Sequence, residues 1–160
     1  MIRPAKRSDL RAAARLAARL VHLHHEFDPL RFFLPDDVEA GYLWWFGKEL
    51  EREEVVLMVA EQGGSVVGYC YGRLEERDWN QLLDASGAIH DIWVEEHARR
   101  SGVATRLLEA ALAALEARGA PRVVLHTAAG NEAAQRLFER LGFRRTMIEM
   151  TREAGGGSSR

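Results

Sequence analysis

Apolar residues in the first fifty positions recur at spacings of three and four, which is the period of an α-helix with one buried face. One segment follows this spacing closely, with inward positions at Leu10, Ala13, Ala17, Leu20 and His24. Because Ser8 precedes it as a candidate N-cap, we expect a helix from Ser8 to about Glu26. The run PDDVEAGYLWWFGKELERE predicts a second helix that begins near Pro35, with acidic residues in its first turn.

The middle of the chain changes to short apolar runs rich in β-branched residues, which are typical of strands. The runs EVVLMVAE (54–61) and SVVGYCYGRLEE (65–76) are separated by QGG, which is a hairpin signal. A third strand is expected at AIHDIWVE (88–95), after a polar connection. These three runs predict the centre of a sheet.

The clearest helical pattern extends from Ser101 to Arg118, where Gly119 and Pro121 end it. Its buried stripe consists of Ala104, Leu107, Leu108, Ala111, Leu112 and Leu115. Spacings of three and four along the whole segment predict that one face of this helix packs on the sheet.

The last third of the chain continues the alternation of strands and helices. RVVLHTA (122–128) predicts a strand, NEAAQRLFERLG (131–142) a helix capped by Asn131, and FRRTMIEMTRE (143–153) a closing strand. The predicted order is β-α-α-β-β-β-α-β-α-β. This order indicates an α/β protein with a mixed central sheet and helices on its faces.

The length of 160 residues is that of one domain, to which we assign residues 1–153. The remaining segment 154–160, AGGGSSR, has nothing to bury and is expected to be a flexible tail. Apolar residues at 47% and charged residues at 29% indicate an ordinary globular protein.

The net charge of -2 gives no reason to expect nucleic acid or an anionic membrane as a partner. The first residues, MIRPAKRSDL, lack the apolar core of a signal peptide, and no apolar run approaches the roughly 18 residues of a membrane span. Cys70 is the single cysteine, so neither an intrachain disulfide nor a cysteine-based zinc site can form. We therefore expect a cytoplasmic protein that uses no metal.

The stretch ARRSGVATRLLEAAL (98–112) brings two arginines and a glycine to the start of a helix whose first turn has no acidic residue. Acidic residues usually favour that place because the N-terminal end of the helix dipole is positive. With Ala104 no capping box engages Ser101, and Gly102 lets a ligand approach the backbone. The pattern predicts an anion site suited to phosphates. The alternative is a plain helix start behind two solvated arginines.

These residues carry a resemblance to a known family. Arg99-Arg100-Ser101-Gly102-Val103-Ala104 fits the Arg/Gln-x-x-Gly-x-Gly/Ala signature of the GNAT superfamily of N-acetyltransferases, and the preceding IHDIWVEEHA resembles the strand and loop that introduce it. NEAAQRLFERLGF (131–143) resembles the family's second motif, Asn-x-x-Ala-x-x-Leu-Tyr-x-x-x-Gly-Phe. The resemblance covers residues 1–152. It implies the GNAT fold, in which a splayed strand pair receives acetyl-CoA.

The resemblance implies which residues hold this cosubstrate. The backbone of Trp93 and Val94 would face the pantetheine arm, which inserts beside the splayed strand as another strand would. The backbone amides of one loop would bind the pyrophosphate, namely those of Arg99, Arg100, Ser101, Gly102, Val103, Ala104 and Thr105. Asn131 would lie near the pantetheine end, although a plain N-cap explains it equally well, and Phe138 would pack on the cofactor.

In the implied reaction an amine attacks the thioester of acetyl-CoA directly. A base must take a proton from the amine, because a free alkyl amine has a pKa of about 10.4. His90 and Asp91 are the candidate catalytic residues, since relatives with a Glu-Asp pair on this strand have acidic residues near the acceptor. Adjacent strand residues face opposite sides, so only one is expected to reach the substrate; a buried structural histidine is the alternative for His90. The amide of Val94 is the candidate oxyanion site.

Phe138 departs from the family pattern, which has a tyrosine there as the usual general acid. Phenylalanine has no proton to give, yet a thiolate whose conjugate acid has a pKa of about 8.5 is a tolerable leaving group. Tyr69, Tyr71 or water is expected to supply the proton instead. This departure changes the expected source of the proton but not the expected cofactor.

Two further clusters need an explanation. The sequence HLHH (22–25) suggests zinc, but no third ligand is evident, and a lining of the acceptor mouth together with Glu26 and Asp28 explains it better. The aromatic run YLWWFG (42–47) indicates core packing, with an acceptor wall or a dimer face as alternatives.

The sequence thus predicts an acetyl-CoA-dependent N-acetyltransferase that acts on a primary amine of a small molecule or a peptide. Two alternatives from other classes stay open. One is a non-catalytic acyl-CoA-binding module, which the missing tyrosine permits. The other is a hydrolase with Cys70 as nucleophile, although nothing local activates that thiol. A homodimer is expected only by analogy with the family.

Overall fold

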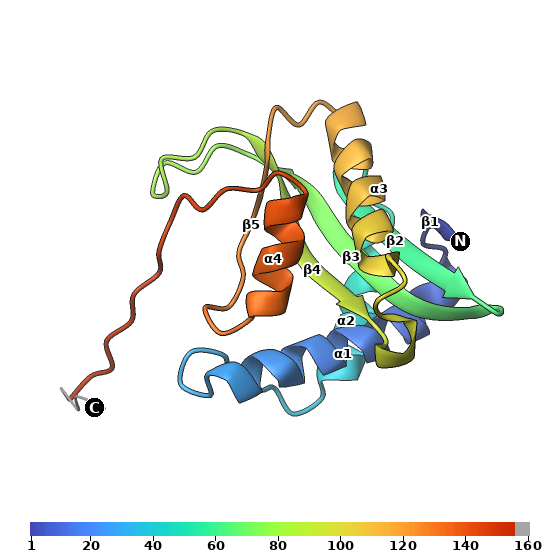
Figure 1. Ribbon diagram of the computed structural model, residues 1–160, viewed down its shortest axis with the longest axis horizontal. Helices are drawn as coiled ribbons and strands as arrows, with labels where there is room; N and C mark the ends of the chain where they lie inside the picture. Colours follow the sequence, from blue (N-terminus) through green and yellow to red (C-terminus); the bar gives the residue numbers. More distant parts are fainter. Residues whose placement is uncertain (156–160) are drawn as a thin grey trace.

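The computed structural model describes residues 1–155, and residues 156–160 of the expected tail lie outside the described part. The strands are β1 (Ile2–Pro4), β2 (Val55–Gln62), β3 (Ser65–Glu75), β4 (Ser86–Val94) and β5 (Val123–Leu125). The α-helices are α1 (Leu10–Phe27), α2 (Val38–Glu49), α3 (Val103–Ala117) and α4 (Glu132–Arg140), with short 3₁₀ helices at Arg7–Asp9 and Glu96–Ala98. Figure 1 shows these elements as one sheet with helices packed around it.

The strands form a single mixed sheet in the order β1-β2-β3-β4-β5. Neighbours from β1 to β4 are antiparallel, whereas β5 runs parallel to β4. The predicted hairpin joins β2 to β3 through Gly63 and Gly64, whose φ angles of 56° and 77° lie in the left-handed region that glycine adopts without strain.

Helices cover both faces of this sheet (Figure 1). One core lies between the sheet and the pair α1 and α2, and includes Phe46, Tyr69 and Tyr71. The other lies between the sheet, α3 and α4, and includes Cys70 and Leu108. Successive β3 residues therefore alternate between the two cores, as the strand period requires. The predicted fold class is confirmed.

β4 and β5 pair over three residues only, Gly87–Ile89 with Val123–Leu125. β4 continues to Val94, and in the described part no strand lies beside this second half on the β5 side. The backbone groups along that edge are open to another hydrogen-bonding partner. This is the splayed strand pair that the resemblance implied.

A β-bulge lies in β4 at the point where β4 and β5 begin to diverge. Tyr71 pairs with Asp91, but the next residue of β3, Gly72, pairs with Ile89, so His90 is an additional residue without a partner on β3. β3 and β4 lie so close together here that a Cβ at Gly72 would be 2.6 Å from a β4 carbonyl oxygen. The bulge redirects the side chains beside it.

Most predicted elements are present, with boundaries that differ by a few residues. α1 begins at Leu10 after a 3₁₀ turn, and α2 begins at Val38, where the Asp37 carboxylate accepts a hydrogen bond of 3.2 Å from the Ala40 amide. β5 is much shorter than the run 122–128 that the sequence predicts, because only three of its residues have a strand beside them. No helix among the described residues is both long and apolar enough to cross a membrane.

The prediction of a closing strand at 143–153 is wrong. After Phe143 the described chain is extended but makes no backbone hydrogen bond, and it runs away from the sheet (Figure 1). We call residues 144–153 the C-terminal segment. A strand needs a partner edge, and side-chain bonds hold this segment away from β5: Arg145 Nε donates to Glu139 Oε1 at 3.0 Å, and Arg31 pairs with Glu149. Its apolar side chains are consequently exposed.

Candidate active site

The turn before α3 has the free amides that its sequence predicts. Arg100 and Gly102 have φ angles of 62° and 75°, so the turn is left-handed twice in three residues. The Ser101 side chain does not cap the helix, because its hydroxyl donates to the Ala98 carbonyl oxygen at 2.9 Å. Within the described chain, the amides of residues 100–105 have no hydrogen-bond acceptor. The Arg99 amide donates to Glu96 at 3.1 Å, so the expected amide site begins one residue later.

Val94 directs its backbone groups to the open edge of β4. The Glu95 amide donates to the Val67 carbonyl of β3 at 2.8 Å, and alternate residues of a strand direct their backbone groups to opposite sides. The Val94 carbonyl accordingly faces away from β3, where it accepts a hydrogen bond of 2.8 Å from Arg99 Nε. By the same alternation the backbone of Trp93 pairs with β3, so the expectation that it faces the open edge is wrong.

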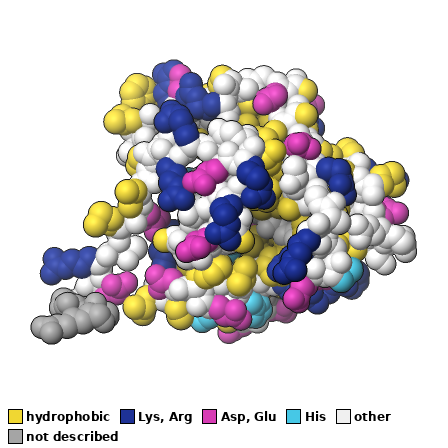
Figure 2. All heavy atoms as spheres, in the orientation of Figure 1, with side chains coloured by type: hydrophobic (Ala, Val, Ile, Leu, Met, Phe, Trp, Pro, Cys, Tyr) yellow, Lys and Arg dark blue, Asp and Glu magenta, His cyan; other side chains and the backbone are white. Residues whose placement is uncertain are grey.

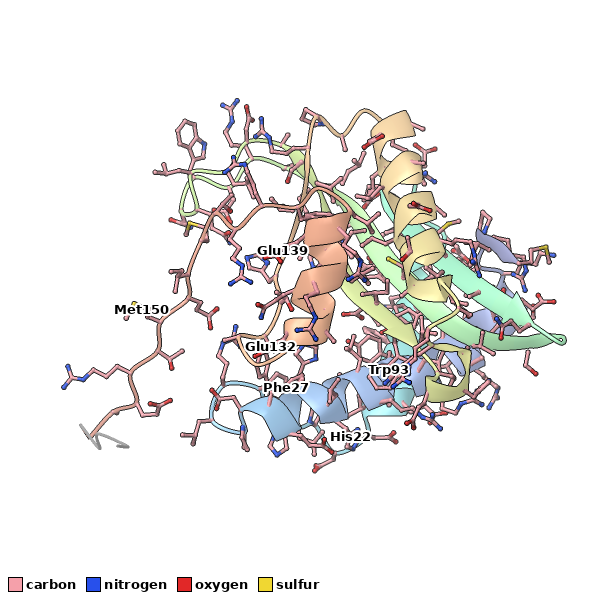
Figure 3. The ribbon with its side chains drawn as sticks, in the orientation of Figure 1. His22, Phe27, Trp93, Glu132, Glu139 and Met150 are labelled. Atoms are coloured by element: carbon pink, nitrogen blue, oxygen red, sulfur yellow. The ribbon has the colours of Figure 1, made fainter. Side chains whose placement is uncertain are left out.

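Side chains add positive charge at this turn. The Arg99 guanidinium lies over the Trp93 ring, 4.8 Å from its centroid, and Figure 3 shows Trp93 at the end of β4 beside α1. Figure 2 shows Lys and Arg side chains around a hollow, largely hydrophobic region between α3, α4 and α1. Free amides, a helix N-terminus and cations are the features of an anion site.

A narrow cavity of about 50 Å³, the inter-strand pocket, opens where β4 and β5 diverge. It is lined by Leu20, His24, Ile89, His90, Ile92, Leu125, His126, Thr127, Asn131, Ala134 and Phe138. Asn131 caps α4, since its side chain accepts a hydrogen bond of 3.2 Å from the Ala134 amide, and the residue also lines the inter-strand pocket. Phe138 is buried against the core and contributes a phenyl wall.

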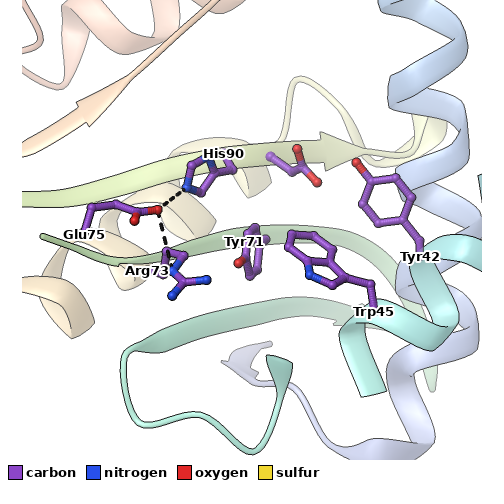
Figure 4. A pocket seen from close by; sticks show the side chains of 7 residues that line it. Tyr42, Trp45, Tyr71, Arg73, Glu75 and His90 are labelled. Carbon is purple, nitrogen blue, oxygen red and sulfur yellow. Dashed lines mark hydrogen bonds and ion pairs between the residues drawn. The ribbon is translucent and has the colours of Figure 1, made fainter. Parts of the chain in front are cut away.

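A larger cavity of about 270 Å³, the sheet-face pocket, lies on the α2 side of β3 and β4 (Figure 4). It is lined by Tyr42, Trp45, Tyr71, Arg73, Glu75, His90 and Asp91. Within the aromatic run of α2, Phe46 is in the core, as predicted, and Tyr42 and Trp45 line the sheet-face pocket. Of the described residues that line either pocket, His90 alone lines both.

His90 is half-exposed and held by a carboxylate. Its Nε2 lies 3.0 Å from Glu75 Oε1, and Arg73 Nε lies 3.6 Å from the same oxygen (Figure 4). The His90 ring also packs against the Tyr71 ring, with 5.7 Å between the ring centroids. His90 is therefore not a buried structural histidine but an oriented imidazole between two cavities.

Asp91 lines the sheet-face pocket together with His90, although strand alternation predicts that the two residues face opposite sides. The extra residue of the bulge breaks the strict alternation on which that expectation rested. Burial raises the pKa of the Asp91 carboxyl, while hydrogen bonds from the hydroxyl groups of Tyr42 and Tyr69 oppose this shift. The Tyr69 hydroxyl donates at 3.2 Å.

Replacing Asp91 by Asn is expected to reduce the pH dependence of stability. Because the native pKa of Asp91 is raised above its unfolded value, its contribution is present at low pH and is lost as the pH rises through the native pKa. The variant, which cannot titrate there, should lose less unfolding free energy than the parent between about pH 4 and pH 8. Urea titrations at both pH values measure this, with the exposed Asp36→Asn as control. Equal pH dependence in all three proteins would contradict the burial of this carboxylate.

The two tyrosines proposed as substitute acids are already engaged. The Tyr71 hydroxyl donates to buried Glu49 at 2.7 Å, and the Tyr69 hydroxyl donates to Asp91. Burial is the largest cause that raises the pKa of both phenols, which makes them weaker acids. Neither lines the inter-strand pocket.

Cys70 is fully buried in the core on the α3 side, opposite the sheet-face pocket, and burial raises the pKa of its thiol. This geometry opposes a hydrolase that uses Cys70 as nucleophile. In the HLHH run, His22 stands on the outer side of α1 (Figure 3), whereas His24 lines the inter-strand pocket. No group of three His, Cys, Asp or Glu among the described residues is arranged to hold a metal ion.

Comparison with known proteins identifies the family. A family model described as "Acetyltransferase (GNAT) family" matches residues 17–143. The chain belongs to the GNAT family. The resemblance drawn from the sequence motifs is confirmed, and the chain is an N-acetyltransferase by class.

Named relatives and solved structures agree with this membership. An N-alpha-acetyltransferase of Sulfurisphaera tokodaii is 33% identical over 136 residues, which cover 82% of this GNAT chain and 80% of the relative. The BH1408 protein of Bacillus halodurans, solved as a tetramutant, has a TM-score of 0.82 at 20% identity, covering 96% of this chain and 99% of that one. An aminoglycoside N-acetyltransferase solved with CoA has a TM-score of 0.70 at 19% identity, covering 96% and 94%. These structural likenesses show the GNAT fold.

Sequence reasoning missed two residues of the candidate site. Glu75, which holds His90, belongs to β3, and His126 follows β5. Neither stands in a motif, and both reach the site through strand pairing across the sheet. The run of aromatic residues in α2 was a usable signal for Tyr42 and Trp45.

Proposed function

We propose that this chain transfers the acetyl group of acetyl-CoA to a primary amine, with the sheet-face pocket as the acceptor site and the inter-strand pocket as the thioester site. The observation that carries this proposal is the position of His90. It stands on the bulge, between the two cavities, where an acceptor amine and a thioester would meet.

Four features support acetyl-CoA as the donor. The free amides of residues 100–105 and the adjacent arginines suit a pyrophosphate, and the edge of β4 that lacks a neighbouring strand suits an amide-bearing arm, with the Val94 carbonyl there shared with Arg99 Nε. The inter-strand pocket suits the narrow thioester end, and solved relatives carry CoA or acetyl-CoA. Acetyl-CoA would supply the activated acyl group, and the Val94 amide is the proposed donor to the carbonyl oxygen.

Charge and aromatic rings suit the sheet-face pocket to a cationic amine. An alkyl amine arrives protonated near neutral pH, since its pKa is about 10.4. Glu75 offers negative charge there, partly balanced by Arg73, and the rings of Tyr42 and Trp45 can contact an ammonium group. His90, oriented by Glu75, is the proposed base that takes the proton before the nitrogen attacks.

The leaving thiolate must be protonated by a side chain or stabilised by solvent at the inter-strand pocket. Phe138 cannot donate one, and Tyr69 and Tyr71 lie outside the inter-strand pocket. His24 and His126 line it and replace the two tyrosines as our candidates. The His24 Nδ1–H donates to the Leu20 carbonyl oxygen at 2.9 Å, so Nε2 can give a proton to the thiolate only when the imidazole carries both protons.

A panel of amines tests the proposal. Release of free CoA from acetyl-CoA is followed with small amines, aminoglycosides and peptides with free N-termini, because the named relatives include proteins of both acceptor classes. We expect release that requires an amine and survives Cys70→Ala. Tight CoA binding without turnover on any amine would favour the non-catalytic module. Release without amine that fails in Cys70→Ala would favour the hydrolase.

A further inference from the structure

Glu49 is a carboxylate in a place that disfavours negative charge. It is the last residue of α2, where the helix dipole is negative, and only 4% of the residue is exposed. A charge persists in such a place only where its partners compensate the loss of water. The proposed reaction gives Glu49 no direct part, so its partners are the first indication of what it does.

Three side chains compensate this carboxylate. The Tyr71 hydroxyl donates to Glu49 Oε2 at 2.7 Å, and Arg73 Nη1 donates to the same oxygen at 3.2 Å. Arg52 Nε lies 3.4 Å from the other oxygen. Tyr71 and Arg73 are alternate residues of β3, so they share one face of the sheet, and both line the sheet-face pocket. Glu49 does not line this pocket and contacts its wall through these two residues.

Arg73 is surrounded by carboxylates. Its Nη1 and Nη2 donate to Glu49 and Glu54, at 3.2 Å and 3.3 Å. Its Nε is buried, has no hydrogen-bond partner among the described residues, and lies 3.6 Å from Glu75 Oε1. His90 Nε2 contacts that same oxygen at 3.0 Å (Figure 4). Arg73 and His90 therefore stand on either side of one carboxylate oxygen, and only His90 is within hydrogen-bond distance of it.

We propose that Glu49 is a positioning residue of the transfer reaction: it holds Arg73 away from Glu75, so that Glu75 stays free to orient His90. This inference rests on the proposed role of His90 as the base. A shift of roughly 0.5 Å would bring Arg73 Nε within hydrogen-bond distance of Glu75. A guanidinium binds a carboxylate more strongly than a neutral imidazole does, so without the charge of Glu49 the arginine would take this oxygen.

The crystal structure of a Glu49→Gln variant tests the positioning directly. Glutamine keeps the size of the side chain and an oxygen that accepts from Tyr71, but removes the charge that attracts Arg73. We expect an Arg73 nitrogen within about 3.2 Å of Glu75 and His90 Nε2 outside that distance. Unchanged distances would overturn the proposal. This measurement needs no turnover, so its outcome does not depend on the proposed function.

Glu54→Gln provides the same structural test if Glu49→Gln does not fold. Glu54 is the other Nη partner of Arg73, and its side chain is 36% exposed, so its loss is easier to tolerate. Arg73 should again move toward Glu75, because one of the two charges that hold it is gone. A guanidinium that keeps its place in this variant would overturn the competition on which the proposal depends.

Kinetics of a double variant test the consequence for the reaction. Glu49→Gln should lower kcat roughly tenfold, because residues of one hydrogen-bond network are coupled, with little change in the KM for acetyl-CoA. Adding Arg73→Met removes the competing group and should recover most of the lost kcat. A residue that only stabilises the fold would not be rescued by a second loss in the same network. A double variant no faster than Glu49→Gln would overturn the proposal.

Glu51→Gln is the matched control, since it makes the same chemical change two residues further along the chain. Glu51 is exposed and pairs with Arg7, away from the pocket, so this variant should keep the parent's kcat. An equal loss in both glutamine variants would refute the role of Glu49. A His90→Ala enzyme as fast as the parent would refute the proposed function together with this inference, whereas failure of the rescue alone refutes only the role of Glu49.

Discussion

Gly102→Glu is expected to weaken the binding of coenzyme A by roughly 100-fold, because the site would lose charge-assisted hydrogen bonds worth about 1.5–3 kcal/mol each. The substitution puts a carboxylate among the free amides of residues 100–105, where it competes for them and repels the pyrophosphate. The new Cβ would also lie 3.2 Å from Arg106 Nη1, so the carboxylate would pair with a nearby cation. Calorimetric titration with CoA measures the loss.

Gly119→Glu is the matched control for this variant. Gly119 also has a left-handed backbone, with φ of 92°, and stands at the other end of α3, where a Cβ would meet nothing within 4 Å. Both variants therefore add the same charge and a similar backbone strain to the same helix. Unchanged affinity in Gly102→Glu, or equal loss in both variants, would mean that the turn before α3 does not hold the phosphates.

His90→Ala is expected to lower kcat by roughly 10²- to 10⁴-fold, the usual range for losing a general base. The KM for acetyl-CoA should change much less than kcat, because the proposed phosphate contacts come from the amides of residues 100–105 and not from His90. The pH–rate profile should also lose the inflection that a histidine gives between about pH 5 and pH 8. Steady-state kinetics across this pH range on the best acceptor amine measure both effects.

His22→Ala provides the comparison, since His22 stands on the outer side of α1 (Figure 3) and lines neither pocket. This variant should keep the parent's rate and profile. A His90→Ala enzyme whose pH profile matches that of the parent would remove His90 from proton transfer and leave Asp91 as the candidate base. Kinetics of Asp91→Asn would then be decisive.

The sequence was most informative where local periodicity and charge decide the structure. Spacings of three and four located α1, α3 and α4 within a few residues, and the acid-free start of α3 indicated the free amides. The same reasoning failed at His90 and Asp91. Alternation assumes one residue per strand position, and a bulge inserts a second one through contacts with β3 that the local sequence does not reveal.

The remaining errors concern partners distant in the chain. The segment 143–153 has a strand-like pattern, yet a strand forms only where another edge is available, and that edge is not a property of the segment. Glu75 and His126 likewise become site residues through strand pairing and packing, not through a motif. Arg99 was expected to offer a free amide, but the short helix before it uses that group.

The extra residue in β4, His90, is free of the cross-strand pairing that constrains other residues of the strand. A residue that pairs with a neighbouring strand must fit the side chain opposite it, whereas His90 has no paired residue on β3. Its side chain can therefore be exchanged for another acid or base without shifting the register of β3 and β4. On the proposed function, adaptation to acceptors of different basicity would therefore be concentrated at this one position, with the proposed donor site left intact.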